Sequence, residues 1–268
     1  MSLVFDHIKC TGCGLCVSDC LQNCLIVEEG HAVQVDDACI SCGHCVAVCP
    51  TEAVAIPEYR MELVEELHPK DTPFDPAQMQ RFLSGRRSIR QYQPRQVERE
   101  KLEVLLETGR MTPTASNRQN LSFVVLQEQL PLIRELAVEA LYRNADQIVA
   151  ETGIERYRDK FVQMHEELAH GCDKLFYGAP SVIVVMERGN SDVNGALAAA
   201  RMEVMAGVMG LGVCYNGFFA QAAELEPLIK QKLGCREKVH IAVAFSIGYP
   251  NVTYRRTAPR KGLRVTWL

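Results

Sequence analysis

Apolar positions in residues 76–268 follow two different periods. Short apolar runs typical of strands occur at Leu121–Leu126, Ser181–Met186, Val213–Tyr215 and Val239–Gly248. Spacing of three and four residues predicts helices at 76–85, Val97–Gly109, Leu132–Asn144, Glu155–His170, Val193–Met209 and Ala222–Leu233. Strands that alternate with helices indicate an α/β or α+β layered fold around a central sheet.

The stretch Val193–Met209 is apolar nearly all round and rich in alanine. Arg201 and Glu203 interrupt it, so we interpret it as a buried helix and not as a membrane span. We expect it to be buried on every side, as a central helix shared between two subunits would be.

The first 57 residues show a repeat instead of long periodic segments. Two runs read C-x2-C-x2-C-x3-C, and the second begins 29 residues after the first. Gly14 aligns with Gly43 and Val17 with Val46, so we expect both halves to fold alike about a pseudo-twofold axis. The runs comprise Cys10, Cys13, Cys16 and Cys20, then Cys39, Cys42, Cys45 and Cys49.

The spacing of these runs predicts two 4Fe–4S clusters. Three thiolates on one tight loop reach three irons of a cube, and the fourth cysteine of the run ligates the other cluster. The predicted ligand sets are Cys10, Cys13, Cys16 and Cys49 for one cluster, and Cys39, Cys42, Cys45 and Cys20 for the other. Structural zinc is the alternative, but zinc sites usually split four ligands into two C-x2-C pairs. The segment resembles the bacterial two-cluster ferredoxins, although Leu21 follows Cys20 where that family often has proline.

Composition narrows the class of protein. Lys and Arg total 29 against 33 Asp and Glu, a formal charge of −4, which argues against nucleic acid or an anionic membrane as main partner. The N-terminus lacks a secretory signal, so we expect a cytoplasmic protein. In a reducing compartment clustered thiols favour metal binding over disulfides, and four cysteines fall outside the repeat spacing: Cys24, Cys172, Cys214 and Cys235.

Four prolines mark a join between two domains. Pro57, Pro69, Pro73 and Pro76 fall within twenty residues, which predicts a linker with one or two helical turns at Met61–Leu67. The expected domains are therefore 1–57, a linker at 58–75, and 76–268.

Four later motifs have polar groups suited to a ligand. In the strip RRSIR, two arginines and a hydroxyl in an alternating extended segment can hold a phosphate, although alone the strip favours simple cationic residues after a helix end. PTASNRQN offers hydroxyls and amides that suit a flavin edge or a turn. GLGVCYNGF brings glycines to a helix–strand junction, and GYPNVTYRRTAPRK supplies arginines near the end of the chain.

The order of these motifs resembles the nitroreductase family of FMN flavoproteins, over roughly residues 76–268. The resemblance implies an α+β sandwich and an obligate homodimer with two FMN sites at its interface. It implies that Arg86, Ser88 and Arg90 hold the FMN phosphate and ribityl chain, with Arg87 beside them. Further residues implied at the FMN site are Pro113, Thr114, Ala115 and Asn117 from the partner subunit with Gln119 close by, Tyr215, Asn216 and Gly217 beside flavin N5, and Arg256 or Arg260 at the phosphate.

The two parts together predict an oxidoreductase that uses FMN and two 4Fe–4S clusters. Electrons would enter from a ferredoxin-like or other low-potential donor and leave to a small acceptor such as a nitroaromatic, a quinone or an enone. No side chain stands out as an essential acid or base. The alternatives are an electron-transfer subunit that relays electrons to a partner enzyme, and a regulatory module whose clusters sense oxygen or iron.

Overall fold

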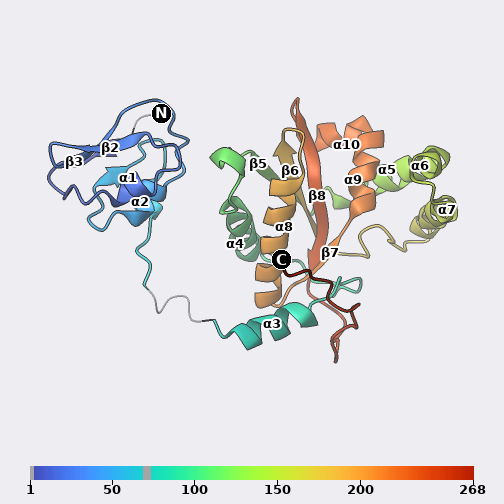
Figure 1. The fold of residues 1–268 in the computed structure, drawn as a ribbon. Coiled ribbons are helices and arrows are strands. Elements are labelled where there is room, and N and C mark those ends of the chain that lie inside the picture. The colour runs from blue at the N-terminus through green and yellow to red at the C-terminus, as the bar shows by residue number, and fades with distance from the viewer. Residues whose placement is uncertain (1–2, 69–73) are drawn as a thin grey trace. The chain divides into compact units, whose positions relative to one another are not determined.

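The computed structural model describes residues 3–68 and 74–268. Contacts within the chain divide it into two compact units, coloured from blue to red along the chain in Figure 1. The first unit comprises Met1–Phe74 with Thr114–Arg118, and the second Asp75–Pro113 with Gln119–Leu268. Positions 69–73 of the predicted linker lie outside the described residues.

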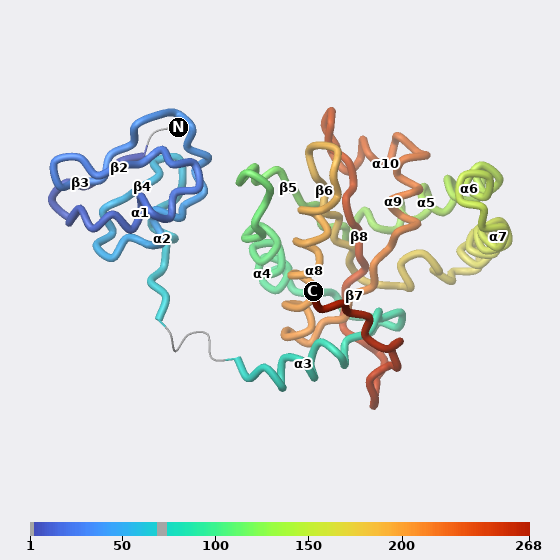
Figure 2. The backbone as a smooth tube through the Cα atoms, in the orientation of Figure 1, coloured from blue at the N-terminus to red at the C-terminus, as the bar shows by residue number. Residues whose placement is uncertain are grey.

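The first unit consists of two short two-stranded sheets and two short helices, traced in Figure 2. Strand β1 pairs antiparallel with β4, and β2 pairs antiparallel with β3. The repeat of 29 residues relates α1 to α2 and β2 to β4. The predicted turns at Met61–Leu67 are one 3-10 turn, η1. The elements are β1 Val4–Phe5, α1 Leu15–Ser18, β2 Leu25–Glu28, β3 His31–Gln34, α2 His44–Val48, β4 Val54–Ala55 and η1 Met61–Leu63.

The buried core of the first unit is small and rich in sulfur. Its buried apolar residues are Cys16, Cys24, Leu25, Ala32, Cys45, Ala53, Val54 and Ile56, so three of the eight are cysteines. A core of this size supplies little hydrophobic stabilisation, and domains this small depend on disulfides, metals or clusters for stability.

The second unit is built on a four-stranded antiparallel sheet with the order β5-β6-β8-β7. Its strands are β5 Leu121–Leu126, β6 Ser181–Arg188, β7 Gly212–Tyr215 and β8 Val239–Gly248. Strand β6 is buried along seven of its eight residues, because helices cover both faces of the sheet. The sequence of such a strand is a continuous apolar run and not an alternation of apolar and polar residues. The predicted α+β class is confirmed.

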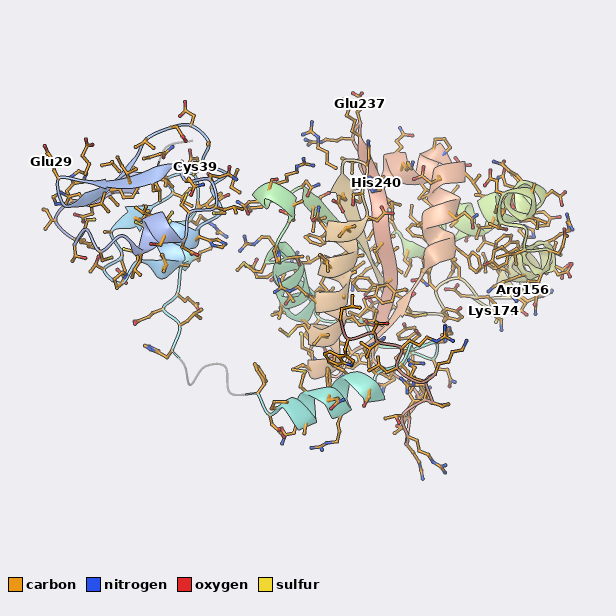
Figure 3. The ribbon with its side chains drawn as sticks, viewed as in Figure 1. Glu29, Cys39, Arg156, Lys174, Glu237 and His240 are labelled. Atoms are coloured by element: carbon orange, nitrogen blue, oxygen red, sulfur yellow. The ribbon has the colours of Figure 1, made fainter. Side chains whose placement is uncertain are left out.

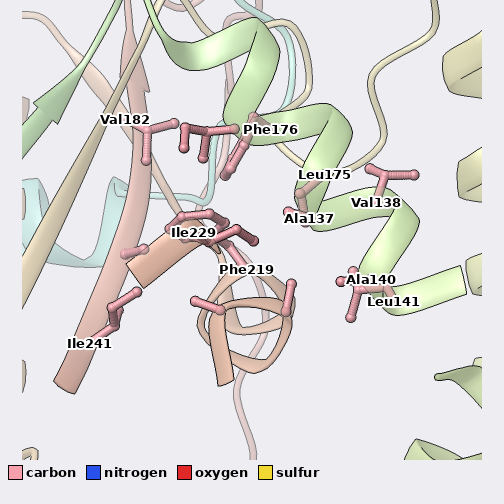
Figure 4. Close-up of a cluster of buried hydrophobic side chains, with 14 of the residues drawn as sticks. Ala137, Val138, Ala140, Leu141, Leu175, Phe176, Val182, Phe219, Ile229 and Ile241 are labelled. Carbon is pink, nitrogen blue, oxygen red and sulfur yellow. The ribbon is translucent and has the colours of Figure 1, made fainter. Parts of the chain in front are cut away.

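Successive residues of β6 contribute to two separate cores. Ile183 and Val185 pack with α4 Arg99–Arg110 and α8 Val193–Val208 on one face. Val182, labelled in Figure 4, and Val184 pack on the other face with α5 Leu130–Arg143, α9 Gly217–Leu225 and α10 Pro227–Lys232. The remaining helices are α3 Pro76–Gly85, α6 Ala145–Thr152 and α7 Arg156–Ala169. Arg156 begins α7 on the outer surface (Figure 3).

The structure differs from the predicted helices in two places. The predicted helix Ala222–Leu233 is split into α9 and α10, because Pro227 cannot donate a backbone hydrogen bond and Glu226 caps the new helix through Leu228 N. Helix α6 was not predicted. In the single chain Leu197 and Val208 of α8 are 50% and 66% exposed, so the burial of this helix on every side, shared between two subunits, stays a prediction. Among the helices of residues 3–68 and 74–268, none is both long and apolar enough to cross a bilayer.

Candidate functional site

The eight cysteines of the two runs line two separate pockets in the first unit. The first pocket is lined by Cys10, Cys13, Cys16 and Cys49. The second pocket is lined by Cys39, Cys42, Cys45 and Cys20, and Figure 3 labels Cys39. The fourth cysteine of each run therefore faces the loop of the other run.

One glycine ends each cysteine loop and begins the helix that follows it. Gly14 and Gly43 are the N-caps of α1 and α2, with φ of 74° and 80°. Glycine adopts this left-handed conformation without steric cost, so the third cysteine of each run enters the first turn of its helix. Cys16 and Cys45 are buried there as a result.

Backbone amides point at several of the cysteine sulfurs. Ala32 N lies 3.3 Å from Cys10 Sγ, and Ala53 N lies 3.3 Å from Cys49 Sγ. Although burial opposes it, hydrogen bonds from Ala53 and Thr51 lower the pKa of the Cys49 thiol. Donors to sulfur stabilise the thiolate, which is the form that binds iron.

Each pocket suits a cluster better than a single ion. In the part of the chain that the structure describes, no three histidine, cysteine or carboxylate side chains converge closely enough to hold one metal ion. The four sulfurs instead surround a volume, as they do when each binds a different iron of a cubic cluster. The residues present therefore fit two 4Fe–4S clusters.

In the second unit, the strip Arg86–Arg90 lies beside strand β7. Ile89 N donates to Val213 O at 2.9 Å. A Cβ on Gly212 would lie 2.3 Å from Ile89 Cγ1, so only glycine allows this approach. Two motifs that are far apart in the sequence, RRSIR and GLGVCYNGF, thus lie side by side.

A buried carboxylate joins the two motifs. Glu203 of α8 forms an ion pair with Arg86 and accepts a hydrogen bond from Tyr215 Oη at 3.3 Å. Burial raises the pKa of Glu203, and the contacts with Arg86 and Tyr215 oppose that rise. Burial raises the pKa of Tyr215, and the neighbouring Glu203 raises it further. The sequence analysis missed Glu203, although a lone acid inside an apolar helix signals a buried partner.

Arg87 provides a test of whether the strip can hold a phosphate. One of its terminal nitrogens, Nη1, donates to Arg86 O. The other, Nη2, is buried without a hydrogen-bond partner among the described residues. A buried guanidinium nitrogen requires an acceptor, and a phosphate oxygen would supply one. The strip therefore fits the phosphate end of a flavin nucleotide.

Arg90 is the last residue of the strip, and its guanidinium lies 5.6 Å from the centre of the Tyr177 ring. Tyr177 has a φ of 61°, which is rare for a residue with a bulky side chain.

Cys214 is 2% exposed and packs in the core. Burial raises the pKa of its thiol, and the neighbouring Arg90 opposes that rise.

The turn Tyr215–Gly217 has one inward and one outward side chain. Asn216 is buried, donates to Leu175 O at 2.9 Å and accepts from Ser246 Oγ at 2.9 Å. Its side chain is therefore occupied within the fold, and its backbone amide donates to Ala244 O at 2.8 Å. Tyr215 is 40% exposed, and Gly217 begins α9.

The other predicted FMN residues lie in the segment 113–119 and in the segment after β8. Thr114, Ala115 and Asn117 are grouped with the first unit, where Asn117 Nδ2 donates to Ile40 O at 3.0 Å and Ser41 O at 2.8 Å. Pro113 and Gln119 flank that segment in the second unit. Arg256 and Arg260 lie exposed in the segment after β8. Their roles at an FMN stay predictions.

Two family models match the chain. The model described as the nitroreductase family matches residues 83–249, and the model described as a 4Fe-4S dicluster domain matches residues 9–54. No curated protein sequence matches the chain. The second match covers both cysteine runs.

Solved structures resemble the chain at low sequence identity. A nitroreductase with bound FMN from Bacteroides fragilis NCTC 9343 is 18% identical, with a TM-score of 0.57 over 70% of this chain and 98% of its own. An FMN-dependent nitroreductase from Clostridium difficile R20291 is 19% identical, with a TM-score of 0.53 over 71% and 100%. A nitroreductase with bound FMN from Desulfitobacterium hafniense DCB-2 is 19% identical, with a TM-score of 0.55 over 71% and 97%. These similarities show a shared fold, and the family model covers more than half of the chain. The chain therefore belongs to the nitroreductase family of oxidoreductases, with a 4Fe–4S dicluster domain in front.

Proposed function

We propose that the protein passes electrons from a low-potential donor, such as a ferredoxin, through two 4Fe–4S clusters to FMN and on to a small acceptor. The observation that carries this proposal is the pair of four-cysteine pockets in a chain that belongs to the nitroreductase family. When bound, the clusters transfer single electrons and FMN transfers two, so a nitroaromatic, quinone or enone is the acceptor class. The cluster part corresponds to residues 1–57 and the FMN part to 76–268, joined by the linker 58–75.

The residues of the second unit would bind and orient FMN. Arg87 Nη2 and Arg86 would donate to the phosphate, with Ser88 and Arg90 along the ribityl chain. Glu203 holds Arg86 by an ion pair and so restricts the orientation of that guanidinium. The turn formed by Asn216 and Gly217 would lie beside flavin N5, and Tyr215 would cover its edge.

The FMN site would be completed by a second copy of the chain. Pro113, Thr114, Ala115, Asn117 and Gln119 would then contact the FMN of the partner subunit, and Arg256 or Arg260 would reach the phosphate. The exposed apolar side chains of α8, Leu197 and Val208, support a homodimer, because burying them against a partner removes apolar area from water.

An anaerobic reconstitution tests the proposal as a whole. We expect about eight irons per chain, as two 4Fe–4S clusters require, together with one FMN. Reduced ferredoxin or dithionite should then support steady turnover of a nitroaromatic or a quinone by the isolated protein. Zinc in place of iron, or no flavin absorbance, would contradict the proposal. Cofactors that are present and reducible without turnover of any acceptor would favour an electron-transfer subunit instead.

Arg87→Ala tests the FMN site directly. Loss of a buried, charged hydrogen-bond donor should weaken FMN binding about tenfold or more, because such bonds contribute about 1.5–3 kcal/mol. The measurement is the FMN dissociation constant from flavin fluorescence. Arg99→Ala is the matched control, since Arg99 is exposed on α4 and pairs with Glu103 of the same helix. Equal FMN affinity in both variants would show that Arg87 does not contact the cofactor.

A further inference from the structure

The loop 173–178, which precedes β6, contacts both of the motifs that lie side by side in the second unit. Asn216, in the turn after β7, donates from its Nδ2 to Leu175 O at 2.9 Å. Two residues further on, the ring of Tyr177 lies 5.6 Å from the guanidinium of Arg90, at the end of the RRSIR strip. No motif in the sequence predicts a role for this loop, yet it joins the two parts of the proposed FMN site.

A buried carboxylate fixes the backbone of this loop. Asp173 Oδ1 accepts hydrogen bonds from Leu175 N at 3.0 Å and Phe176 N at 2.8 Å. Its Oδ2 accepts from Gly178 N at 3.2 Å and pairs with Arg134 Nη1 of α5 at 3.3 Å. The Asp173 side chain is only 6% exposed, and polar contacts shielded from water are stronger than exposed ones. The backbone on both sides of the loop's tyrosine is therefore held in one conformation.

That conformation is unfavourable for a tyrosine. Tyr177 has a φ of 61°, in the left-handed region that residues with a Cβ adopt only at a cost in free energy. The next residue, Gly178, has nearly the same φ of 67° but no Cβ. Glycine at position 177 would fit the same backbone without strain, so the backbone gives no reason for a tyrosine there. A strained residue that the surrounding structure holds in place indicates a function of its side chain.

The side chain of Tyr177 restricts Arg90. The Arg90 guanidinium lies over the Tyr177 ring within the distance at which a cation is attracted to an aromatic face. A hydrogen bond with Tyr177 is also the main reason why the pKa of Arg90 is raised. Arg90 is exposed, and a long exposed side chain loses rotamer freedom when it binds a ligand. A guanidinium that is already ordered loses less freedom, so it binds more tightly.

We propose that Tyr177 is a positioning residue of the FMN site, which holds the Arg90 guanidinium in the orientation that binds the cofactor. The inference rests on the proposed function in one respect, namely that Arg90 contacts FMN. Asp173 supports this arrangement indirectly, because it fixes the loop that carries Tyr177. The strain at position 177 is then offset by an arginine that is oriented before FMN binds.

FMN dissociation constants of full-chain variants, measured by flavin fluorescence, test this proposal. Tyr177→Gly should weaken FMN binding about two- to fivefold, the effect expected for one cation–π contact, although glycine relieves the backbone strain. Tyr177→Phe keeps the ring and should lose less affinity than Tyr177→Gly. Lys238→Gly is the matched control, because Lys238 is an exposed residue with a similar φ of 64° before β8, and its FMN affinity should equal that of the wild type.

A double-mutant cycle shows whether Tyr177 acts through Arg90. Arg90→Ala alone should weaken FMN binding about tenfold, as expected for a lost charged hydrogen bond. Adding Tyr177→Gly to Arg90→Ala should then cause no further loss, because the residue that Tyr177 positions is already absent. A purely structural role of Tyr177 would instead give the same loss in both backgrounds.

Unchanged FMN affinity in Tyr177→Gly, or an equal loss with and without Arg90, would overturn the proposal. If Tyr177→Gly does not fold, as judged by circular dichroism, Tyr177→Asn replaces it in both comparisons, because asparagine tolerates the left-handed region. Wild-type FMN affinity in Arg90→Ala would contradict the placement of Arg90 at the cofactor in the proposed function. That outcome differs from a failure of the cycle, so the two failures are distinguishable.

Discussion

The two cysteine pockets have the same ligand spacing and matching backbone, but different surroundings. Around the first pocket lie Gly12, Leu15, Thr51 and Ala53, and around the second lie Ser41, His44, Gln22 and Cys24 at the corresponding positions. The ligands fix which cluster can form, whereas hydrogen bonds, burial and nearby charge set its potential and stability. The two halves of a duplicated segment can therefore bind the same kind of cluster, while the two clusters differ in stability and midpoint potential.

The largest effect should come from Gly12→Ala. Gly12 has a φ of +67°, and a Cβ there would lie 2.3 Å from Gly30 O, so the loop of the first pocket must shift. We expect a loss of about 3 kcal/mol from backbone strain and overpacking. Ser41→Ala is the control, because Ser41 already has a Cβ at a φ of 51° and should lose no more than about 1 kcal/mol. Denaturant titration followed by cluster absorbance measures both.

If both variants lost stability equally, the two loops would be equivalent in spite of their different residues. If only Gly12→Ala released iron, the loop of the first pocket would tolerate substitution less well than the loop of the second.

A smaller effect is expected from Thr51→Val. The Thr51 hydroxyl can donate to the thiolate of Cys49, and a donor to sulfur stabilises the reduced cluster. Removal of one hydrogen bond of about 0.5–1.5 kcal/mol should lower the midpoint potential of the first cluster by roughly 20–60 mV. Voltammetry of the wild-type and variant proteins measures the shift. A shift of both clusters, or an unchanged potential after Thr51→Val, would show that this hydroxyl does not tune the first pocket.

The smallest effect is expected from His44→Leu, which gives the second pocket the residue found at Leu15 in the first. His44 Nδ1 lies 3.2 Å from Asp19 Oδ2, but both side chains are at least half exposed. Exposed pairs contribute little, so the free energy of unfolding should change by less than about 0.5 kcal/mol, and both clusters should remain. Asp19→Asn, measured by the same denaturant titration, is the companion variant. A loss of more than 1 kcal/mol would assign His44 a role in the second pocket beyond this ion pair.

Patterns local in sequence gave reliable predictions. Residue spacing alone predicted every strand of the four-stranded sheet, because strands buried on both faces form apolar runs that are visible without a partner. The exchange of Cys20 and Cys49 between the runs also followed from spacing, since three ligands on one tight loop leave the fourth to the other half of the repeat. The helix boundary at Pro227 was missed, although proline is a local signal.

Interactions between distant residues were decided only by the tertiary structure. Glu203 lies 117 residues after Arg86, and no sequence period relates them, so their ion pair required the folded sheet that brings α8 beside the strip. The same holds for the inward side chain of Asn216, which is held by Leu175 and Ser246. Cys24 was visible in the sequence as a cysteine outside the spacing, but its 3.6 Å approach to Cys20 depends on a left-handed turn at Asn23. The sequence determines which groups are available for chemistry, because composition and spacing are local, whereas the fold determines which of them meet.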